Sequence, residues 1–553
     1  MQQMKGVSIS QGLAVGKIVV LTSAAAPEAQ AGTPEEELER FQRAQQQAVR
    51  DLGALYEKAR AELGEAEAEI FSVHQLMAED EDFADLITAA IAGGAEASEA
   101  VRQAGEQCAA MFSSMDDAYM RERAADVQDV AARIRRILRG EAETTLTGPC
   151  LIAAEELTPS QTVQFPRAFV QGFLTARGAA NSHTGILART LGVPAVSQLP
   201  VDAQLQGRTA ILNGDEGMLI LDPDEDQLRA AEAGIRARQA QREALQQLAK
   251  LPSVTKDGHA IRLYANLAGT DDLPLLQQSG AEGVGLLRSE FLYLGRSSYP
   301  TEDELFASYR QLVQAMDGRE IIIRTLDIGA DKKADYFDLP PEDNPALGLR
   351  AIRLCLTRPA LLQTQLCAIL RASAFGNVGV MFPMVTSVWE VREAKKYCEE
   401  VKRDLKAEGI PFAEDVQVGI MIETPAAAIM SDRLAKEVDF FSCGTNDLTQ
   451  YTLACDRQNN DLGRFYDPHN PAVLRLLKMV TENAHKNGIW VGICGELGAD
   501  LTLTETFLAI GVDELSVSPR AVLPLRNAVR MTDTRESAPR LLAAIDAEFP
   551  ETL

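Results

Sequence analysis

The fold is decided by the stretch Asp439-Phe440-Phe441-Ser442-Cys443-Gly444-Thr445-Asn446-Asp447, an apolar run that ends in an amide and a carboxylate. Similar runs recur through the second half of the chain and alternate with segments of helical periodicity. They predict eight strands, at residues 261–266, 283–288, 320–327, 378–385, 416–423, 439–444, 489–494 and 514–518. Strands that alternate with helices are typical of parallel α/β architecture, and eight of them in about 300 residues predict a (β/α)8 barrel.

Polar or reactive side chains stand at the ends of six of these eight runs. They are Asn266, Arg288, Arg324 with Asp327, Glu423, Asn446 with Asp447, and Cys494 with Glu496. Because the active site of such a barrel is built at the C-terminal ends of its strands, we expect these side chains to converge on one mouth.

The charges at the predicted mouth divide into two kinds. Arg288 and Arg324 offer forked donors to a phosphate or carboxylate, whereas Glu423 and Asp447 offer the hard oxygens that Mg²⁺ prefers. Phosphoryl transfer needs little else, because positioning and charge neutralisation supply most of its catalysis. On the residues alone, salt bridges from the arginines to nearby carboxylates are an equally good interpretation.

A second stretch carries a histidine in a setting that suits phosphate. It reads Gly178-Ala179-Ala180-Asn181-Ser182-His183-Thr184-Gly185-Ile186-Leu187-Ala188-Arg189. Either Ser182 or Thr184 could cap a helix that runs to Leu191, which places His183 at the helix N-terminus, where backbone N–H groups favour an anion. The local residues alone leave an ordinary loop histidine open as the alternative.

The first half of the chain alternates between strand and helix patterns. Short strands are predicted near residues 6–10 and 16–21, helices from 34 to about 140, and strands again between 150 and 221. We therefore expect a helical bundle, residues 25–144, inserted into one α/β domain made of residues 1–24 and 145–222. A polar helical linker at 223–252 and the barrel at 253–553 complete the predicted domains.

Length and charge restrict the function further. A chain of 553 residues is expected to form two to four domains. Its net charge of −26 argues against nucleic acid and anionic membranes and favours a basic protein partner. No apolar run is long enough to cross a bilayer, and the eight scattered cysteines suggest reduced thiols, so a cytoplasmic protein without membrane insertion is expected.

The histidine stretch resembles the phosphohistidine signature of the phosphoenolpyruvate-utilising enzymes, although Gly185 stands where the family usually has a small residue with a Cβ. Residues 439–451, continuing to Asp456-Arg457, are similar to the family's second signature, with Cys443 replacing an aliphatic residue. Residues 285–291, 324–329 and 344–350 match three further segments. The likeness extends over essentially the whole chain and is closest to the members that start the sugar phosphotransferase system.

The resemblance implies a set of site residues. Phosphoenolpyruvate would be held by Arg288, Arg324, Asn446 and Arg457, with Arg350 close by. Mg²⁺ would be bound by Glu423 and Asp447.

The resemblance also implies the chemistry. His183, with Thr158 and Arg189 nearby, would take the phosphoryl group, and Cys494 would protonate the enolpyruvate that remains to give pyruvate. A thiol suits that task because, with a pKa of about 8.5, it is mostly protonated at neutral pH. The phosphoryl group would then pass to a histidine of the phosphocarrier protein HPr, docked on the helical insert.

Within that insert, His74 is expected to be a packing or interface histidine rather than a second phosphate site. A homodimer formed through the barrel is a further implication of the resemblance.

The sequence argues against three other functions. A dikinase or synthase of the same superfamily would need an additional ATP-binding domain, and a magnesium-dependent aldolase would have no use for residues 1–250. A regulatory or specialised paralogue that only binds carrier proteins is expected to have lost His183, Cys494 or a metal carboxylate, and all of these are present.

Overall fold

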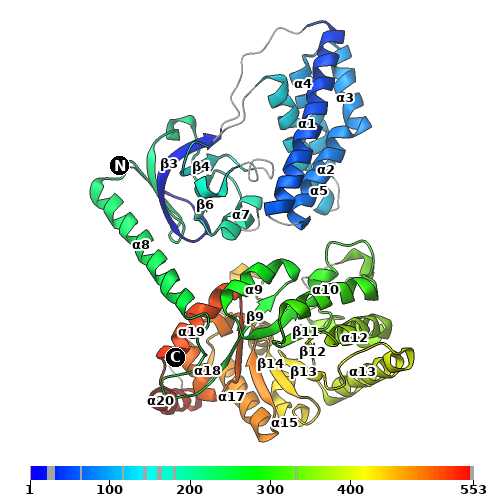
Figure 1. The fold of residues 1–553 in the computed structure, drawn as a ribbon, viewed down its shortest axis with the longest axis vertical. Coiled ribbons are helices and arrows are strands. Elements are labelled where there is room, and N and C mark those ends of the chain that lie inside the picture. The colour runs from blue at the N-terminus through cyan, green and yellow to red at the C-terminus, as the bar shows by residue number, and fades with distance from the viewer. Residues whose placement is uncertain are drawn as a thin grey trace. The chain divides into compact units, whose positions relative to one another are not determined.

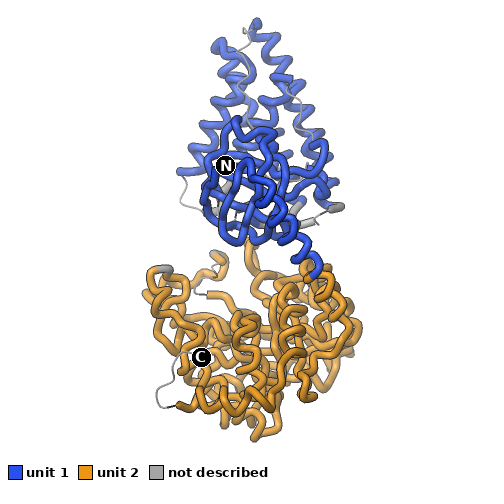
Figure 2. The backbone as a smooth tube through the Cα atoms, turned by 90° about the vertical axis from the view of Figure 1, so that its left-hand side faces the viewer, with its two compact units in different colours: residues 1–240 blue, residues 241–553 orange. Residues whose placement is uncertain are grey.

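The computed structural model describes residues 2–21, 32–62, 65–114, 118–140, 146–157, 165–178, 182–329, 332 and 334–547. The chain divides into two compact units, Met1–Ala240 and Gln241–Leu553, which Figure 2 shows in different colours. Among the described residues, no helix combines the length and the apolar character that crossing a membrane requires.

Unit 1 contains one mixed sheet with the strand order β1-β8-β7-β3-β4-β5-β6-β2. The strands are β1 Gln2–Lys5, β2 Val7–Ser10, β3 Leu13–Leu21, β4 Cys150–Ala154, β5 Val170–Thr175, β6 Ala195–Ser197, β7 Thr209–Asn213 and β8 Met218–Leu221. The pairs β3–β4, β4–β5 and β5–β6 are parallel. The pairs β1–β8, β8–β7, β7–β3 and β6–β2 are antiparallel.

Both faces of this sheet are covered. Along β4, Leu151 and Ala153 belong to one apolar cluster, whereas Ile152 belongs to the other, because successive side chains of a strand point to opposite faces. Helix α7, His183–Leu191, packs on the second face through Ala188, which is fully buried in the same cluster as Ile152. The sheet therefore supports the helix that begins at His183.

A bundle of five helices lies between β3 and β4 in the sequence (Figure 1). These are α1 Pro34–Glu62, α2 Glu65–Glu79, α3 Glu81–Ala92, α4 Ala97–Ser113 and α5 Ala118–Leu138. They share an apolar core of their own, in which Leu52, Phe71 and Ile87 are almost completely buried. The split α/β domain with a helical insert is thus as predicted. Helix α8, Glu225–Gln247, follows the last strand of the sheet.

Unit 2 is a closed barrel of eight parallel strands. The strands are β9 Arg262–Leu267, β10 Gly283–Arg288, β11 Ile321–Arg324, β12 Val378–Phe382, β13 Gln417–Ile422, β14 Phe440–Cys443, β15 Trp490–Ile493 and β16 Glu514–Val517. All eight predicted strands are present, so the (β/α)8 barrel is confirmed.

Helices surround the barrel in Figure 1. They are α9 Leu273–Ser279, α10 Glu302–Ala315, α11 Ala351–Thr357, α12 Pro359–Ser373, α13 Val388–Glu408, α14 Pro425–Ile429, α15 Ser431–Leu434, α16 Thr445–Leu453, α17 Pro471–Lys486, α18 Thr504–Ile510, α19 Val522–Met531 and α20 Thr534–Asp546.

Alternation along the strands separates two apolar clusters in the barrel. Phe441 packs in the large cluster that includes the surrounding helices, whereas Phe440 packs in a smaller one with Met381, Met421 and Cys494. The smaller cluster is the interior of the barrel. Cys494 therefore belongs to the barrel interior.

Strand β1, Gln2–Lys5, is not among the strands predicted from the sequence. This strand is short, polar and mostly exposed, so no alternation of apolar residues marks it. It joins the sheet only by pairing with β8 at the edge.

Candidate active site at the barrel mouth

The barrel brings most of the predicted site residues to the C-terminal ends of its strands. Arg288 and Arg324 are the last residues of β10 and β11 and are partners in the strand register. Glu423 directly follows β13, and Cys494 directly follows β15. Asn446 and Asp447 lie in the first turn of α16, which begins two residues after β14.

A buried network of charges fixes the position of Arg324. Its guanidinium donates from Nη2 to Glu290 Oε1 at 2.5 Å, and its Nη1 lies 3.2 Å from Asp327 Oδ2. Lys332 Nζ contacts the same two carboxylates, at 2.7 and 2.9 Å. Burial alone would raise the pKa of Glu290, but the charges of Arg324 and Lys332 outweigh it and lower that pKa. The guanidinium of Arg324 is therefore charged and fixed in position by its ion pairs.

Arg350 joins this network from the start of α11. Its Nη2 lies 2.9 Å from Asp327 Oδ1 and 3.8 Å from Asp447 Oδ2, and its Nη1 donates to the hydroxyl of Tyr451 at 3.3 Å. The side chain is 2% exposed. Asp327 thus connects three cations. For Arg324 the salt bridges of the alternative interpretation do exist, and they orient its guanidinium within the mouth.

The two predicted metal ligands lie in a region of crowded negative charge. Glu423 is buried and accepts a hydrogen bond from the backbone N–H of Met384 at 2.5 Å. Burial, together with the charges of Asp447 and Asp327, raises the pKa of Glu423 to about 7. One oxygen of Asp447, Oδ1, is buried without a hydrogen-bond partner among the described residues.

These observations fit a divalent cation. A positive ion between Glu423 and Asp447 would relieve their repulsion and contact Asp447 Oδ1, the oxygen that has no hydrogen bond within the described chain. Over the part of the chain that the structure describes, no group of three or more His, Cys, Asp or Glu side chains could hold a metal ion. Mg²⁺ commonly takes one or two carboxylates and completes its shell with substrate phosphate and water, so two ligands suffice.

Asn446 and Arg457 lie beside the carboxylate of Asp447. Asn446 Oδ1 accepts a hydrogen bond from the backbone N–H of Glu496 at 3.0 Å, which ties α16 to the loop after β15. The guanidinium of Arg457 lies 3.9 Å from Asp447 Oδ1, and its backbone N–H donates to Gln450 Oε1 at 3.0 Å. Both side chains therefore border the same mouth.

Cys494 lies beneath this polar surface. It is 1% exposed, and its Sγ lies 3.7 Å from the backbone oxygen of Cys443. Burial raises the pKa of the thiol to about 12. The thiol is therefore protonated at neutral pH, as a proton donor must be.

The remaining predicted site residue, His183, lies in unit 1 and is the first residue of α7. The side chain of Ser182 caps the helix by accepting a hydrogen bond from the N–H of Gly185 at 3.3 Å, and Gly192, with φ of 69°, ends it. Arg189 Nη1 donates to the backbone oxygen of Ile9 at 3.5 Å, which holds α7 to β2. The helix begins one residue before the predicted start at Thr184, with Ser182, one of the two predicted caps, as its N-cap, and His183 stands at its N-terminus. Thr158 lies outside the described residues.

In the helical insert, His74 is completely buried, with Nε2 3.3 Å from Asp126 Oδ1 and Nδ1 3.8 Å from Asp129 Oδ2. This is the environment of a packing histidine.

Lys332 is the functional candidate that sequence reasoning missed. It lies eight residues beyond the end of β11, where no pattern connects it to the strand ends. The structure shows why it is needed: Glu290 and Asp327 are buried side by side, and two such carboxylates require more positive charge than Arg324 alone supplies.

The chain matches three family descriptions along its length: "PEP-utilising enzyme, N-terminal" over residues 5–123, "PEP-utilising enzyme, mobile domain" over 146–217, and "PEP-utilising enzyme, PEP-binding domain" over 242–534. The last match contains all of the barrel-mouth residues described above. The chain is therefore an enzyme of a class that works on phosphoenolpyruvate.

Relatives that match this chain over almost its whole length show which members of this class it is most similar to. The chain is 41% identical over 545 residues to a phosphoenolpyruvate-protein phosphotransferase of Bacillus subtilis (strain 168), covering 97% of this chain and 96% of the relative. A protein of the same name from Listeria innocua serovar 6a is 41% identical over 546 residues, covering 97% and 95%. The chain belongs to the PEP-utilising enzyme family, among its phosphoenolpyruvate-protein phosphotransferases, and is a transferase.

Among solved structures, "NMR solution structure of Enzyme I (nEIt) protein using two 4D-spectra" is 33% identical, covers 42% of this chain and 99% of its own, and has a TM-score of 0.38.

Proposed function

We propose that this enzyme transfers the phosphoryl group of phosphoenolpyruvate to His183, releases pyruvate, and passes the phosphoryl group on to a histidine of HPr. The observation that carries the proposal is the barrel mouth, where fixed cations lie beside two buried carboxylates and above a protonated thiol. The arginines can donate hydrogen bonds to the phosphate and carboxylate of the substrate, and the two carboxylates can bind the metal ion. The enolate that remains after phosphoryl transfer can take its proton from the thiol.

In this proposal, Arg288, Arg324, Asn446 and Arg457 hold phosphoenolpyruvate, with Arg350 contributing from the Asp327 network. Asp327 and Glu290 keep Arg324 and Arg350 in place, so the substrate does not have to order them on binding. Glu423 and Asp447 would hold Mg²⁺, which when bound neutralises developing charge on the phosphoryl oxygens. Cys494 donates its proton to the carbon of enolpyruvate.

The N-terminus of α7 supports His183 as the nucleophile. Backbone N–H groups of the first helical turn have no carbonyl partner within the helix, and they favour a dianionic phosphate on the residue that begins it. Ser182 fixes where the helix starts and therefore where His183 is presented.

The helical insert is the proposed docking site for HPr. Leu76 at 67% and Met111 at 52% are large apolar side chains exposed on α2 and α4, and the net charge of −26 suits a basic partner. The predicted domain boundaries, the homodimer through the barrel and the cytoplasmic location are parts of this proposal. So is a hinge in the connection around residues 222–251, which would let His183 meet phosphoenolpyruvate at the barrel mouth and HPr at the helical insert in turn.

A specialised or regulatory paralogue is the alternative. It would dock carrier proteins without turning over phosphoenolpyruvate.

The test is labelling with phosphoenolpyruvate that carries radioactive phosphate. In the presence of Mg²⁺ we expect one acid-labile, base-stable phosphoryl group per chain, lost in His183→Ala and retained in His259→Ala, which changes an exposed histidine. Labelled protein mixed with HPr should pass the label on. Label that persists in His183→Ala would refute the nucleophile, and an unlabelled wild-type protein would favour the paralogue.

A further inference from the structure

Asn266 stands near the mouth end of β9 but has no role in the site described above. Its neighbours Ala265 and Leu267 pack in the large cluster that includes the surrounding helices, so alternation along the strand turns the Asn266 side chain into the barrel. Its amide nitrogen donates hydrogen bonds to the backbone oxygens of Cys494, at 3.0 Å, and Ser516, at 3.1 Å. Its amide oxygen accepts a hydrogen bond from the hydroxyl of Ser516 at 2.6 Å. The amide therefore joins β9 to β16 and to the residue that carries the proposed proton donor.

Backbone pairing between strands does not extend to Cys494. The pairing of β15 with β16 ends at Ile493 and Leu515, one residue before Cys494. The amide of Asn266 continues the connection between these strands beyond that point, because it bonds to a backbone oxygen of each. A backbone carbonyl in the buried interior requires a donor, so this hydrogen bond fixes the backbone of Cys494.

The other side of the Cys494 loop is fixed by β14 and α16. The backbone N–H of Cys494 donates to the backbone oxygen of Cys443 at 3.1 Å. A Cβ on Gly495 would lie 2.0 Å from Thr445 Oγ1, so the loop packs directly against the first residue of α16. A change of Asn266 therefore releases the β9 side of the loop and leaves the contacts on its other side in place.

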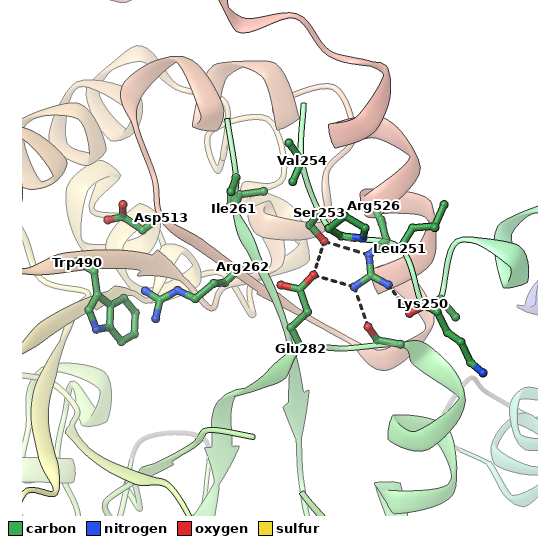
Figure 3. A pocket seen from close by; sticks show the side chains of 14 residues that line it. Lys250, Leu251, Ser253, Val254, Ile261, Arg262, Glu282, Trp490, Asp513 and Arg526 are labelled. Atoms are coloured by element: carbon green, nitrogen blue, oxygen red, sulfur yellow. Dashed lines mark hydrogen bonds and ion pairs between the residues drawn. The ribbon is translucent and has the colours of Figure 1, made fainter. Parts of the chain in front are cut away.

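Strands β9 and β15 also meet at the opposite end of the barrel, where β16 again lies between them in the strand order. The guanidinium of Arg262, the first residue of β9, lies 4.1 Å from the ring centre of Trp490, the first residue of β15 (Figure 3). Both side chains line a cavity of about 640 Å³ at this end. Because this contact fixes the start of β15, loss of the Asn266 amide should shift the loop after the strand rather than the strand itself.

We propose that Asn266 is a positioning residue for proton transfer, which holds the backbone of Cys494 so that the thiol faces one side of the enolpyruvate carbon. The proposal rests on the proposed role of Cys494 as proton donor. In this step the S–H bond breaks, and the electron pair of the enolate double bond forms a C–H bond at the methylene carbon. The enolate oxygen becomes the carbonyl oxygen of pyruvate, and solvent returns a proton to the thiolate. Asn266 keeps its own protons throughout, and a thiol held on one side delivers its proton to one face of the carbon.

The stereochemistry of the product tests this role, because a loss of folded protein lowers the rate without changing the face to which the proton is added. The substrate is phosphoenolpyruvate that carries deuterium in the Z position at C3, the solvent is tritiated water, and the pyruvate is trapped at once as lactate. Wild-type protein should give a chiral methyl group with one configuration in excess. Asn266→Leu keeps a side chain of similar size but cannot donate, so it should give a nearly equal mixture, because water then protonates much of the enolpyruvate.

The rate and the binding of substrate should separate in the same variant. Pyruvate formation by Asn266→Leu should fall at least about tenfold, since a displacement of about 1 Å can cost roughly 10²-fold. Calorimetry should show that phosphoenolpyruvate still binds as it does to wild type, because the arginines that would hold it are unchanged.

Two further variants and a control complete the design. Ser516→Ala removes the hydroxyl that orients the amide of Asn266 and should change the stereochemistry in the same direction by a smaller amount. In Cys494→Ala, the addition of Asn266→Leu should cause no further loss of pyruvate formation, because two residues that act through one group are not additive. Asn483→Ala is the matched control and should match wild type, since Asn483 is also half-buried in unit 2 and links two helices, with Nδ2 donating to Ser431 Oγ at 2.9 Å.

The wild-type excess of one configuration in Asn266→Leu would overturn the positioning role, and so would a further loss of pyruvate formation when Asn266→Leu is added to Cys494→Ala. If Asn266→Leu does not fold, unchanged stereochemistry in Ser516→Ala overturns the role instead. Failure of the wild-type protein to form phosphohistidine, or unchanged turnover in Cys494→Ala, would overturn the proposed function rather than this inference alone.

Discussion

Replacing Glu514 by Gln should change how the stability of unit 2 depends on pH. The folded-state pKa of Glu514 is about 8, raised first by burial, whereas an unfolded glutamate ionises near its usual value of 4.5. Between these values the folded protein retains a proton that the unfolded chain has lost. The stabilising contribution of that proton is complete below pH 4.5 and is lost as the pH rises through 8.

The size of the effect follows from the shift. A separation of about 3.5 pH units at 1.36 kcal/mol per unit gives about 5 kcal/mol, and the group is buried, so solvent screens little of it. Glutamine occupies the same space without ionising. The stability of Glu514→Gln relative to wild type should therefore rise by about 3–5 kcal/mol between pH 5 and pH 9.

Urea unfolding followed by tryptophan fluorescence can measure this difference in the full chain. Both tryptophans of the protein, Trp389 and Trp490, lie in unit 2, so the signal reports that unit alone. Glu536→Gln, which changes an exposed glutamate in α20, is the control and should follow wild type at every pH. Parallel pH profiles for Glu514→Gln and wild type would refute the idea that an uncharged acid is buried in the barrel.

Other changes should separate the roles of individual side chains. Cys494→Ala should slow pyruvate formation at least about hundredfold while calorimetry shows that phosphoenolpyruvate still binds, and unchanged turnover would make Cys494 structural. Glu423→Gln should weaken Mg²⁺ binding at least about tenfold in a magnesium titration of labelling, because one of two carboxylate ligands is lost; an unchanged midpoint would place the metal elsewhere. Ser182→Ala should destabilise the start of α7 by about 1 kcal/mol, seen as faster amide hydrogen exchange there, and Thr301→Ala, which removes the cap of α10, should leave that exchange unaltered. Arg526→Met should lower the stability of unit 2 by about 3 kcal/mol in the same urea assay, since the buried guanidinium donates to the backbone oxygens of Leu248, Ala249 and Gly280; a loss below about 1 kcal/mol would show that these bonds add little.

The barrel and most of its mouth could be predicted because both depend on patterns within short stretches of the sequence. Each strand is an apolar run, and in a parallel barrel all strand ends meet at one face, so Arg324, Glu423 and Cys494 could be grouped without any knowledge of distances. The helix start at Ser182 and His183 is equally local, since a cap acts over three residues.

Glu514 and Lys332 could not be found in this way. Glu514 stands at the first position of a strand, where charged residues are usually solvated, and only the closure of the barrel turns it inward between Gly285 and Gly492. Lys332 reaches Glu290 and Asp327 from a loop, and loop geometry depends on the packing around it rather than on a repeating pattern.

The parallel pairing of β3 with β4 has a consequence for how the chain folds. Leu21 is the register partner of Ala154, so the first unit cannot complete its sheet until the whole helical insert has been synthesised. The insert is rich in contacts between sequence neighbours and has its own core, whereas the sheet depends on pairing across more than a hundred residues. Local contacts form faster than distant ones, so the helices should be in place first and shorten the gap that β3 must bridge. During synthesis on the ribosome, β3 therefore stays unpaired while the bundle folds. The folding rate of the bundle sets how long the backbone N–H and C=O groups of this apolar strand remain exposed.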